Sequence, residues 1–288
     1  MTEWLARRFE EHRPHLRRAA YRMLGSFDDA EDAIQEAWLR LSRNESSGIA
    51  NLGGWLTTVV GRICLDMLRS RRLKREDPLE LTIPDFLVSR EAGPEDDAML
   101  ADSVGLALLV VLDTLTPAER LAFVLHDLFA LPFDEIAPII GRSSEAARQL
   151  ASRARRRVQG AESPETDLGR QRELVDAFVA AAHGGDFDAL IRVLDPEVVL
   201  RADRDPASRG IRGSVAVAEQ AVGFARLVQR TESVIINGAP GIVSWLPNGK
   251  PMAILAFILA RDRIAEIYVI SSPERVEQLL DYRAPSPR

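Results

Sequence analysis

Residues 115–158 read LTPAERLAFVLHDLFALPFDEIAPIIGRSSEAARQLASRARRRV and carry the clearest structural pattern in the chain. Thr116 and Glu119 have the spacing of a capping box, and a proline stands between them at the first helical position. Gly141 is placed to end a second, short helix, and Ser143 is placed to cap a third. A helix, a tight turn and a helix in this order predict a helix-turn-helix. Pro138, inside the short helix, predicts a kink there.

The last helix of this stretch concentrates positive charge. Residues 141–158 hold six arginines and one glutamate, in a 288-residue chain of net charge −6. A stripe of apolar positions faces inward, so the other positions form a polar face. Arginine makes planar contacts with phosphates and guanine edges, and glutamine pairs with adenine. A solvated charged helix is the plain alternative, which the preceding glycine turn disfavours. The candidate DNA-contacting residues are Arg142, Ser144, Glu145, Arg148, Gln149, Ser152, Arg153 and Arg156.

A second basic segment lies near residue 70. Between residues 61 and 75 there are six basic residues and one acidic residue, on a helix expected from Trp55 to about Arg72. An aromatic ring and an amide beside a basic face suit the stacking and recognition of an unpaired base. The alternative for Trp55 is that it only fills the core. The candidates here are Asn51, Trp55, Thr58, Arg62, Asp66, Arg69, Arg71 and Arg72.

Residues 28–41, DDAEDAIQEAWLRL, form an acidic amphipathic helix for which Asp28 is the expected N-cap. An acidic face next to DNA-binding candidates does not suit DNA, so we expect it to dock another protein, although a merely solvated face has the same pattern. The face away from Ile34 and Leu41 consists of Asp29, Asp32, Gln35, Glu36 and Leu39.

Composition divides the rest of the chain. Residues 76–102 contain nine carboxylates and one arginine, which predicts a linker. The tail has 15 basic and 15 acidic residues, with helices, then strand-like runs and an Asn248-Gly249 hairpin turn, which predicts an α+β domain with an antiparallel sheet. The expected fold is therefore multi-domain, with two all-α domains before an α+β domain. The expected boundaries are 1–75, a linker 76–103, a helix-turn-helix domain 104–160 and a tail 170–288.

Several classes of protein are disfavoured. A single cysteine, Cys64, excludes an internal disulfide, fits a reducing cytoplasm and has the spacing of a core residue. No apolar run has the ~18 residues of a membrane helix, and the N-terminus lacks a signal-peptide pattern. The four histidines have no partners at metal spacing, so we expect no metal, no cofactor and no membrane association.

Together these motifs resemble the group IV, extracytoplasmic-function sigma factors of bacterial RNA polymerase, over roughly residues 5–158. The resemblance implies that residues 28–41 dock on the β′ clamp helices of core polymerase. It implies that 54–72 read and melt the −10 promoter element, and that 115–158 meet the β flap and the −35 element. The acidic linker stands where the family threads a segment toward the polymerase cleft.

The tail, about 170–288, resembles the SnoaL-like, ketosteroid-isomerase-type cone that some group IV sigma factors carry. The resemblance implies regulation of the sigma core from the same chain, through contact with the first domain or the linker. Two motifs depart from that branch. Its DGGGK is replaced by DRDPASRG at 203–210, and its NPDKL by SSPERV at 271–276.

The tail leaves an enzymatic alternative open. Asp203 or Asp205 could serve as a general base, with Tyr268 and His183 the only candidate oxyanion donors. A surface Asp-Pro turn explains the carboxylates more simply, so we expect no catalytic residues. The remaining alternatives are a helix-turn-helix regulator with a ligand-sensing tail, and an isomerase or cyclase fused to a DNA-binding module. A tail pocket would be lined by Asp203, Asp205, Phe224, Trp245 and Phe257.

Overall fold

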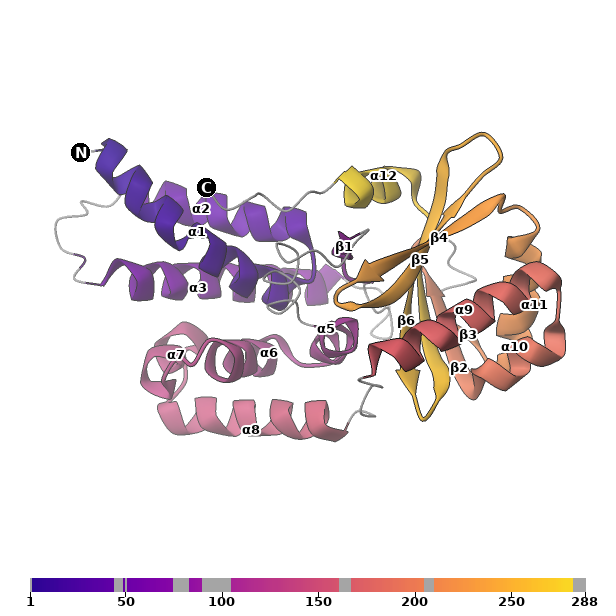
Figure 1. Cartoon of the computed structure of the whole chain (residues 1–288). Helices are drawn as coiled ribbons and strands as arrows, with labels where there is room; N and C mark the ends of the chain where they lie inside the picture. The colour runs from indigo at the N-terminus through magenta and orange to yellow at the C-terminus, as the bar shows by residue number, and fades with distance from the viewer. Residues whose placement is uncertain are drawn as a thin grey trace. The chain divides into compact units, whose positions relative to one another are not determined.

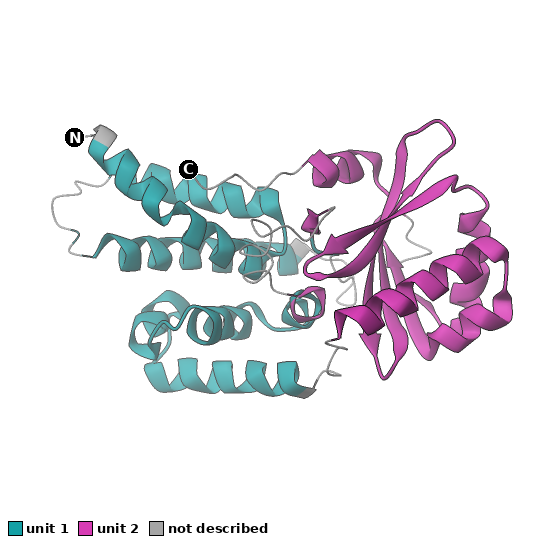
Figure 2. Ribbon diagram, viewed as in Figure 1, with its two compact units in different colours: residues 1–84, 109–161 teal, residues 85–108, 162–288 magenta. Residues whose placement is uncertain are grey.

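The computed structural model describes residues 2–43, 49, 51–74, 83–89, 105–160, 167–204 and 210–281. The chain forms two compact units (Figures 1 and 2). Unit 1 comprises residues 1–84 and 109–161, and unit 2 comprises residues 85–108 and 162–288. These units group the segments differently from the expected boundaries, because both helical segments share unit 1 and most of the linker falls with the tail.

The first three helices of unit 1 pack through small residues. Ala30, Ala33 and Ala37 are fully buried on α2, which lets the neighbouring helices approach closely. The prediction that Asp28 is the N-cap of α2 was wrong. The helix already begins at Phe27, and the Ser26 hydroxyl accepts from the Asp29 amide at 3.4 Å. These helices are α1 (Thr2–Leu24), α2 (Phe27–Arg43) and α3 (Leu52–Lys74).

The helix-turn-helix is confirmed with its predicted caps. Thr116 and Glu119 form the capping box. Gly141 ends α7 with φ of 72°, a conformation that glycine adopts without strain, and the Ser143 hydroxyl accepts from the Ala146 amide at 3.2 Å. Its elements are α5 (Leu106–Asp113), α6 (Pro117–Phe123), the π-type turn η2 (Val124–Leu128), α7 (Phe133–Ile140) and α8 (Ser144–Gly160).

Unit 2 is built on a mixed sheet, seven-stranded among the described residues, with strand order β1-β4-β5-β6-β7-β2-β3. The antiparallel prediction was wrong for one pair, since β2 runs parallel to β7. The Asn248-Gly249 turn is confirmed, with Gly249 at φ of 77° and the Leu246 amide bonded to the Lys250 carbonyl at 2.9 Å. The strands are β1 (Val88–Ser89), β2 (Leu194–Ala202), β3 (Ile211–Arg212), β4 (Arg230–Ile236), β5 (Ala239–Trp245), β6 (Pro251–Ala260) and β7 (Arg263–Ile270).

Helices α9, α10 and α11 cover one face of this sheet (Figure 1). Their buried residues, including Phe178, Leu190 and Val217, form one apolar core with sheet residues such as Phe257 and Ile267. The predicted α+β architecture is therefore confirmed, although α12 was not predicted. The helices are α9 (Leu168–Gly184), α10 (Phe187–Val193), α11 (Ser214–Ala225) and α12 (Pro273–Asp281). Within the described ranges, no helix has the length and apolarity to cross a bilayer.

Candidate functional site

The polar face of α8 is exposed and positively charged. Ala147, Ala151 and Ala154 are fully buried beneath it, as the stripe predicted. Ser144 and Ser152 are half-buried. Four arginines form no ion pair with any described residue, so their guanidinium groups are available to an anion; they are Arg142, Arg148, Arg153 and Arg156. Glu145 and Gln149 are exposed beside them.

Two other arginines of α8 brace the motif instead. Arg155 donates to Asp127 at 2.5 and 3.0 Å, and Arg157 pairs with Glu119 at 3.1 Å. Glu119 also accepts from the Thr116 amide and hydroxyl at 3.0 and 2.8 Å. The capping box of α6 is thereby tied to the end of α8, so these arginines hold the helix in place.

The predicted −10 residues lie on α3 and at its start. Trp55 and Thr58 are half-buried, and Thr58 donates to the Gly54 carbonyl at 2.9 Å. The Asn51 side chain accepts from the Gly54 amide at 3.0 Å, so its carbonyl oxygen caps the helix. Arg72 is exposed.

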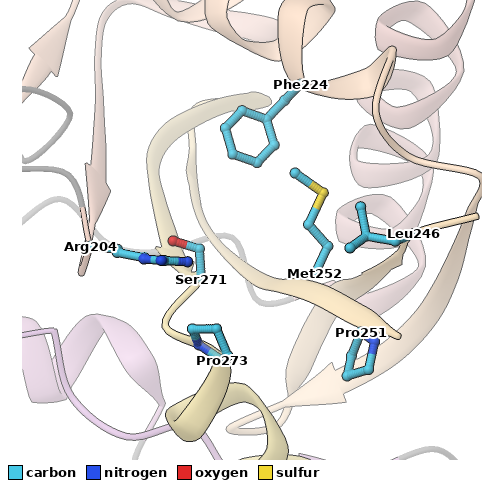
Figure 3. A pocket seen from close by; sticks show the side chains of 7 residues that line it. All are labelled: Arg204, Phe224, Leu246, Pro251, Met252, Ser271 and Pro273. Atoms are coloured by element: carbon cyan, nitrogen blue, oxygen red, sulfur yellow. The ribbon is translucent and has the colours of Figure 1, made fainter. Parts of the chain in front are cut away.

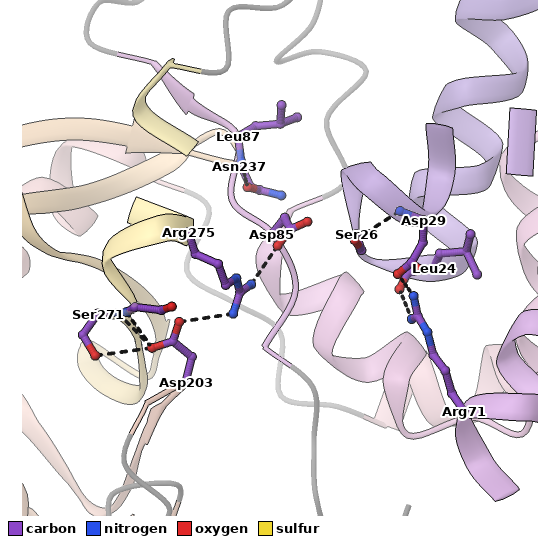
Figure 4. A network of polar contacts seen from close by, with 11 residues as sticks. Leu24, Ser26, Asp29, Arg71, Asp85, Leu87, Asp203, Asn237, Ser271 and Arg275 are labelled. Atoms are coloured by element: carbon purple, nitrogen blue, oxygen red, sulfur yellow. Dashed lines mark hydrogen bonds and ion pairs between the residues drawn. The ribbon is translucent and has the colours of Figure 1, made fainter. Parts of the chain in front are cut away.

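Other cations of α3 are already engaged. Arg62 donates to the Pro138 carbonyl of α7 at 3.3 Å. Arg69 pairs with Asp66 at 3.7 Å, and both side chains are largely exposed. Arg71 donates to the Leu24 carbonyl at 2.9 Å and pairs with Asp29 of α2 (Figure 4).

Helix α3 packs directly on the helix-turn-helix within unit 1. A Cβ added at Gly61 would lie 3.4 Å from Ile139 and 3.5 Å from Leu125. Nearby, the buried Arg120 of α6 donates to Asp113 at 3.2 Å and to the Arg22 carbonyl at 3.3 Å. Burial lowers the Arg120 pKa to about 10 despite the neighbouring Asp113 carboxylate. Apolar packing and a buried cation therefore both hold the first three helices against the helix-turn-helix.

The acidic face of α2 divides into two kinds of residue. Asp32, Gln35 and Leu39 are exposed, and Glu36 pairs with Arg40 at 2.8 Å near them. Asp29 is half-buried and paired with Arg71. Four of the five predicted residues thus offer an open surface, whereas Asp29 links α2 to α3.

In unit 2 the described part of the linker is bonded to the tail. Strand β1 pairs antiparallel with β4, at the edge of the sheet. Asn237 holds Leu87 from both sides, because its side chain accepts from the Leu87 amide at 2.8 Å and its own amide donates to the Leu87 carbonyl at 3.0 Å (Figure 4). Asn237 has φ of 49°, a left-handed conformation that asparagine adopts more readily than most residues.

A chain of charged contacts adds a second attachment. Arg275 of α12 donates to Asp85 of the linker at 2.7 Å and to Asp203 at 3.3 Å. Asp203 also accepts from the Ser271 and Ser272 amides at 2.9 and 3.3 Å. Asp203 thus holds the turn before α12 and orients Arg275 toward the linker.

The expected tail-pocket residues are not brought together. Phe224 lines two cavities of unit 2, and Figure 3 shows it above the larger one. Trp245 lies under the Arg230 guanidinium at 4.4 Å, and Phe257 packs on Phe178 with ring centroids 5.5 Å apart. Asp203 is engaged as described above, and Asp205 lies outside the described residues.

Sequence reasoning missed Asn237, Arg275 and Ser271. The Asn237-Gly238 dipeptide between two strand-like runs was available as a hairpin signal of the same kind as Asn248-Gly249. Arg275 was noticed only as part of a motif that departs from the expected pattern. Its partner in the linker is 190 residues away in the sequence, beyond the reach of local patterns.

The fold and these surfaces define a helix-turn-helix DNA-binding protein with an α+β tail. The Sigma-70 region 2 family matches residues 8–74, and the Sigma-70, region 4 family matches residues 105–158. The chain is 35% identical over 278 residues to the probable ECF RNA polymerase sigma factor SigI of Mycobacterium tuberculosis, covering 93% of both proteins. It is 37% identical over 290 residues to the ECF sigma factor SigJ of the same species, covering 93% of this chain and 91% of that protein.

The crystal structure of Mycobacterium tuberculosis SigJ superposes with a TM-score of 0.72 at 32% identity, covering 98% of this chain and 100% of that one. The chain therefore belongs to the extracytoplasmic-function sigma factors of RNA polymerase, which act in transcription initiation. The expected order of two sigma segments and an α+β tail is confirmed.

Proposed function

We propose that the chain docks on core RNA polymerase through α2 and recognises promoters through α3 at −10 and α8 at −35. The observation that carries the proposal is the exposed face of α8, the last helix of the capped helix-turn-helix. Four arginines of this turn and helix form no ion pair among the described residues. The polymerase-binding face would consist of Asp32, Gln35, Glu36 and Leu39 against the β′ clamp helices, with the helix-turn-helix against the β flap. A complex with polymerase places its action in the cytoplasm.

Unit 1 has to open before both promoter elements are contacted. Helix α3 packs on α7, and α7 packs on α8. Packed helices lie 8–10 Å apart, so α3 and α8 are separated by no more than roughly 20 Å. The −10 and −35 elements are about 25 base pairs apart, which is roughly 85 Å along B-DNA. Docking on polymerase would supply the contacts that replace the α3–α7 packing.

The tail would regulate this opening by holding the linker. Residues 85–89 connect the two promoter-binding segments, and they are bonded to β4, Asn237 and Arg275 of the tail. A linker segment paired with a sheet edge is tethered to the tail and is no longer free to follow separated segments. Release of the linker would therefore favour the open, promoter-binding form.

We expect the tail to act without catalysis. Asp203 is occupied by two backbone amides and Arg275, an arrangement that suits a fixed structural anion better than a general base. Tyr268 lies between Ile267 and Val269, which both line the inner cavity, so its side chain projects to the other face of the sheet. There its hydroxyl donates to Glu266 at 2.5 Å. Of the three candidate groups that the structure describes, Asp203, Tyr268 and His183, only His183 lines the cavity.

In vitro transcription with core polymerase and a library of promoter fragments tests the proposal. We expect specific transcripts from the full-length chain and increased transcription from Arg275→Ala and Asn237→Ala. Arg226→Ala, which removes an exposed arginine elsewhere on the tail, serves as the control. Absence of specific transcripts from the full chain, both linker variants and a 1–168 truncation would overturn the sigma-factor proposal. Equal activity of the linker variants and the full chain would overturn regulation by the tail.

A further inference from the structure

Two cavities meet inside the tail. An inner cavity of about 130 Å³ lies between α9, α11 and the sheet, and an outer cavity of about 550 Å³ opens beside it. Phe224 and Ser271 line both cavities and so form the boundary between them. Figure 3 shows Phe224 facing Met252 on one side of the outer cavity, with Arg204 and Ser271 on the other. The two cavities therefore adjoin at Phe224 and Ser271.

The inner cavity is apolar with a few hydrogen-bonding groups. Phe178, Leu200 and Val269 are among its apolar walls, and Thr231 and Ser244 contribute hydroxyls. In another protein, an apolar cavity of about 150 Å³ stays dry and binds benzene. The volume and lining here suit a molecule of one ring, or an aliphatic equivalent, with a single hydroxyl or carbonyl group.

The boundary residue Ser271 also begins the route to the linker. Its amide and hydroxyl donate to Asp203 at 2.9 and 3.3 Å. Asp203 accepts from Arg275 at 3.3 Å, and Arg275 donates to Asp85 at 2.7 Å (Figure 4). Three consecutive polar contacts thus join the wall of the cavity to the linker.

We infer that the inner cavity binds a small, predominantly apolar molecule with one hydrogen-bonding group, and that its binding stabilises the docked linker. A ligand against Ser271 fixes the turn that presents Asp203, and Asp203 orients Arg275 toward Asp85. Coupling between two sites is reciprocal, so a docked linker strengthens ligand binding by the same factor. The second half of this inference rests on the proposed regulation by the tail, whereas the binding site does not.

The test uses the full-length chain and four probes: p-cresol, toluene, indole and cyclohexanol. Methyl resonances of the cavity residues report binding, and hydrogen exchange of the Leu87 amide reports linker docking. We expect saturable binding of at least one probe and slower exchange at Leu87, by about 5-fold. Ala221 lines the cavity on α11 and Ala216 is exposed on the same helix, so Ala221→Leu should abolish binding and Ala216→Leu should preserve it.

Arg275→Ala provides a second variant that leaves the cavity walls intact. We expect this variant to bind the probe more weakly. Its affinity should fall by the same factor by which the probe slows exchange of the Leu87 amide in the parent chain. No saturable binding of any probe, or equal binding by Ala221→Leu, overturns the site. Binding without a change at Leu87 overturns the coupling. Transcription by Arg275→Ala without any probe tests regulation by the tail separately. A failure of the ligand site is thereby distinguished from a failure of regulation by the tail.

Discussion

Helices α3 and α8 carry similar excesses of positive charge but differ in how much of it is available. Residues 61–75 and 141–158 each contain six basic residues and one acidic residue. On α8, Arg148 and Arg153 project without ion pairs among the described residues. On α3, Arg62 is bonded to α7 and Arg71 to α2. Equal charge therefore leaves unequal numbers of side chains without a protein partner, and in the proposed mechanism α3 reaches DNA only after the unit opens.

The largest effect should come from preventing that opening. A Cβ at Gly61 would lie 3.4 Å from the Ile139 side chain, so Gly61→Cys with Ile139→Cys, in a Cys64→Ala background, should bring two thiols within reach of a disulfide. We expect the oxidised protein to lose transcription in the reconstituted assay and to regain it with reductant. Gly61→Cys alone should be insensitive to oxidation. Full activity of the oxidised double-cysteine protein would show that α3 functions while packed on α7.

The next largest effect should separate the two kinds of arginine on α8. Removal of Arg148 and Arg153 together should weaken promoter binding by the holoenzyme about 100-fold, because each such contact contributes 1–3 kcal/mol. Arg155→Ala with Arg157→Ala removes the same two positive charges from side chains paired with Asp127 and Glu119, so we expect a much smaller loss. Filter binding at fixed salt concentration measures both. Equal losses would mean that charge alone, rather than position on the polar face, determines binding.

A smaller contrast exists on α2. Asp32→Asn should weaken affinity for core polymerase without changing the free energy of unfolding, because Asp32 is exposed. Asp29→Asn should instead lower the free energy of unfolding by about 1 kcal/mol, because it removes the partner of Arg71 from a half-exposed ion pair. Fluorescence titration with core polymerase and urea unfolding measure the two quantities. The same response from both variants would remove the distinction between docking and bracing residues on this face.

Local patterns predicted the helix-turn-helix well because its determinants are local. The caps at Thr116 and Ser143 and the turn at Gly141 each depend on residues within one helical turn. The start of α2 was misplaced because Ser26 and Asp28 are both good caps, and only the observed backbone selects the serine. Pattern and propensity therefore fix the helices more reliably than their ends.

The linker contacts could not be predicted in the same way. Strand β1 has two residues, too few for an alternating pattern, and its partner Asn237 is 150 residues from Leu87. The parallel pairing of β2 and β7 is equally non-local. Asp203 was interpreted as a possible base because its sequence neighbours reveal nothing of Arg275, which arrives from α12. Such sites depend on the tertiary fold.

The smallest expected effect concerns Glu119, the carboxylate that pairs with Arg157 near the end of α8. Burial favours the neutral form of Glu119, but hydrogen bonds from Thr116 and the charges of Arg157 and Arg153 outweigh it and lower the Glu119 pKa. A lowered carboxyl pKa contributes stability above the unfolded value of about 4.3, and that contribution is lost as the pH falls through the folded value. Glu119→Gln cannot titrate, so its free energy of unfolding should decline less steeply in acid, after a loss of about 1 kcal/mol near neutral pH. Urea unfolding followed by circular dichroism across this range measures both terms, with Glu145→Gln on the exposed start of α8 as the control. An unchanged acid dependence in Glu119→Gln would show that the Thr116 hydrogen bonds and the arginine charges together do not favour the folded-state carboxylate of Glu119.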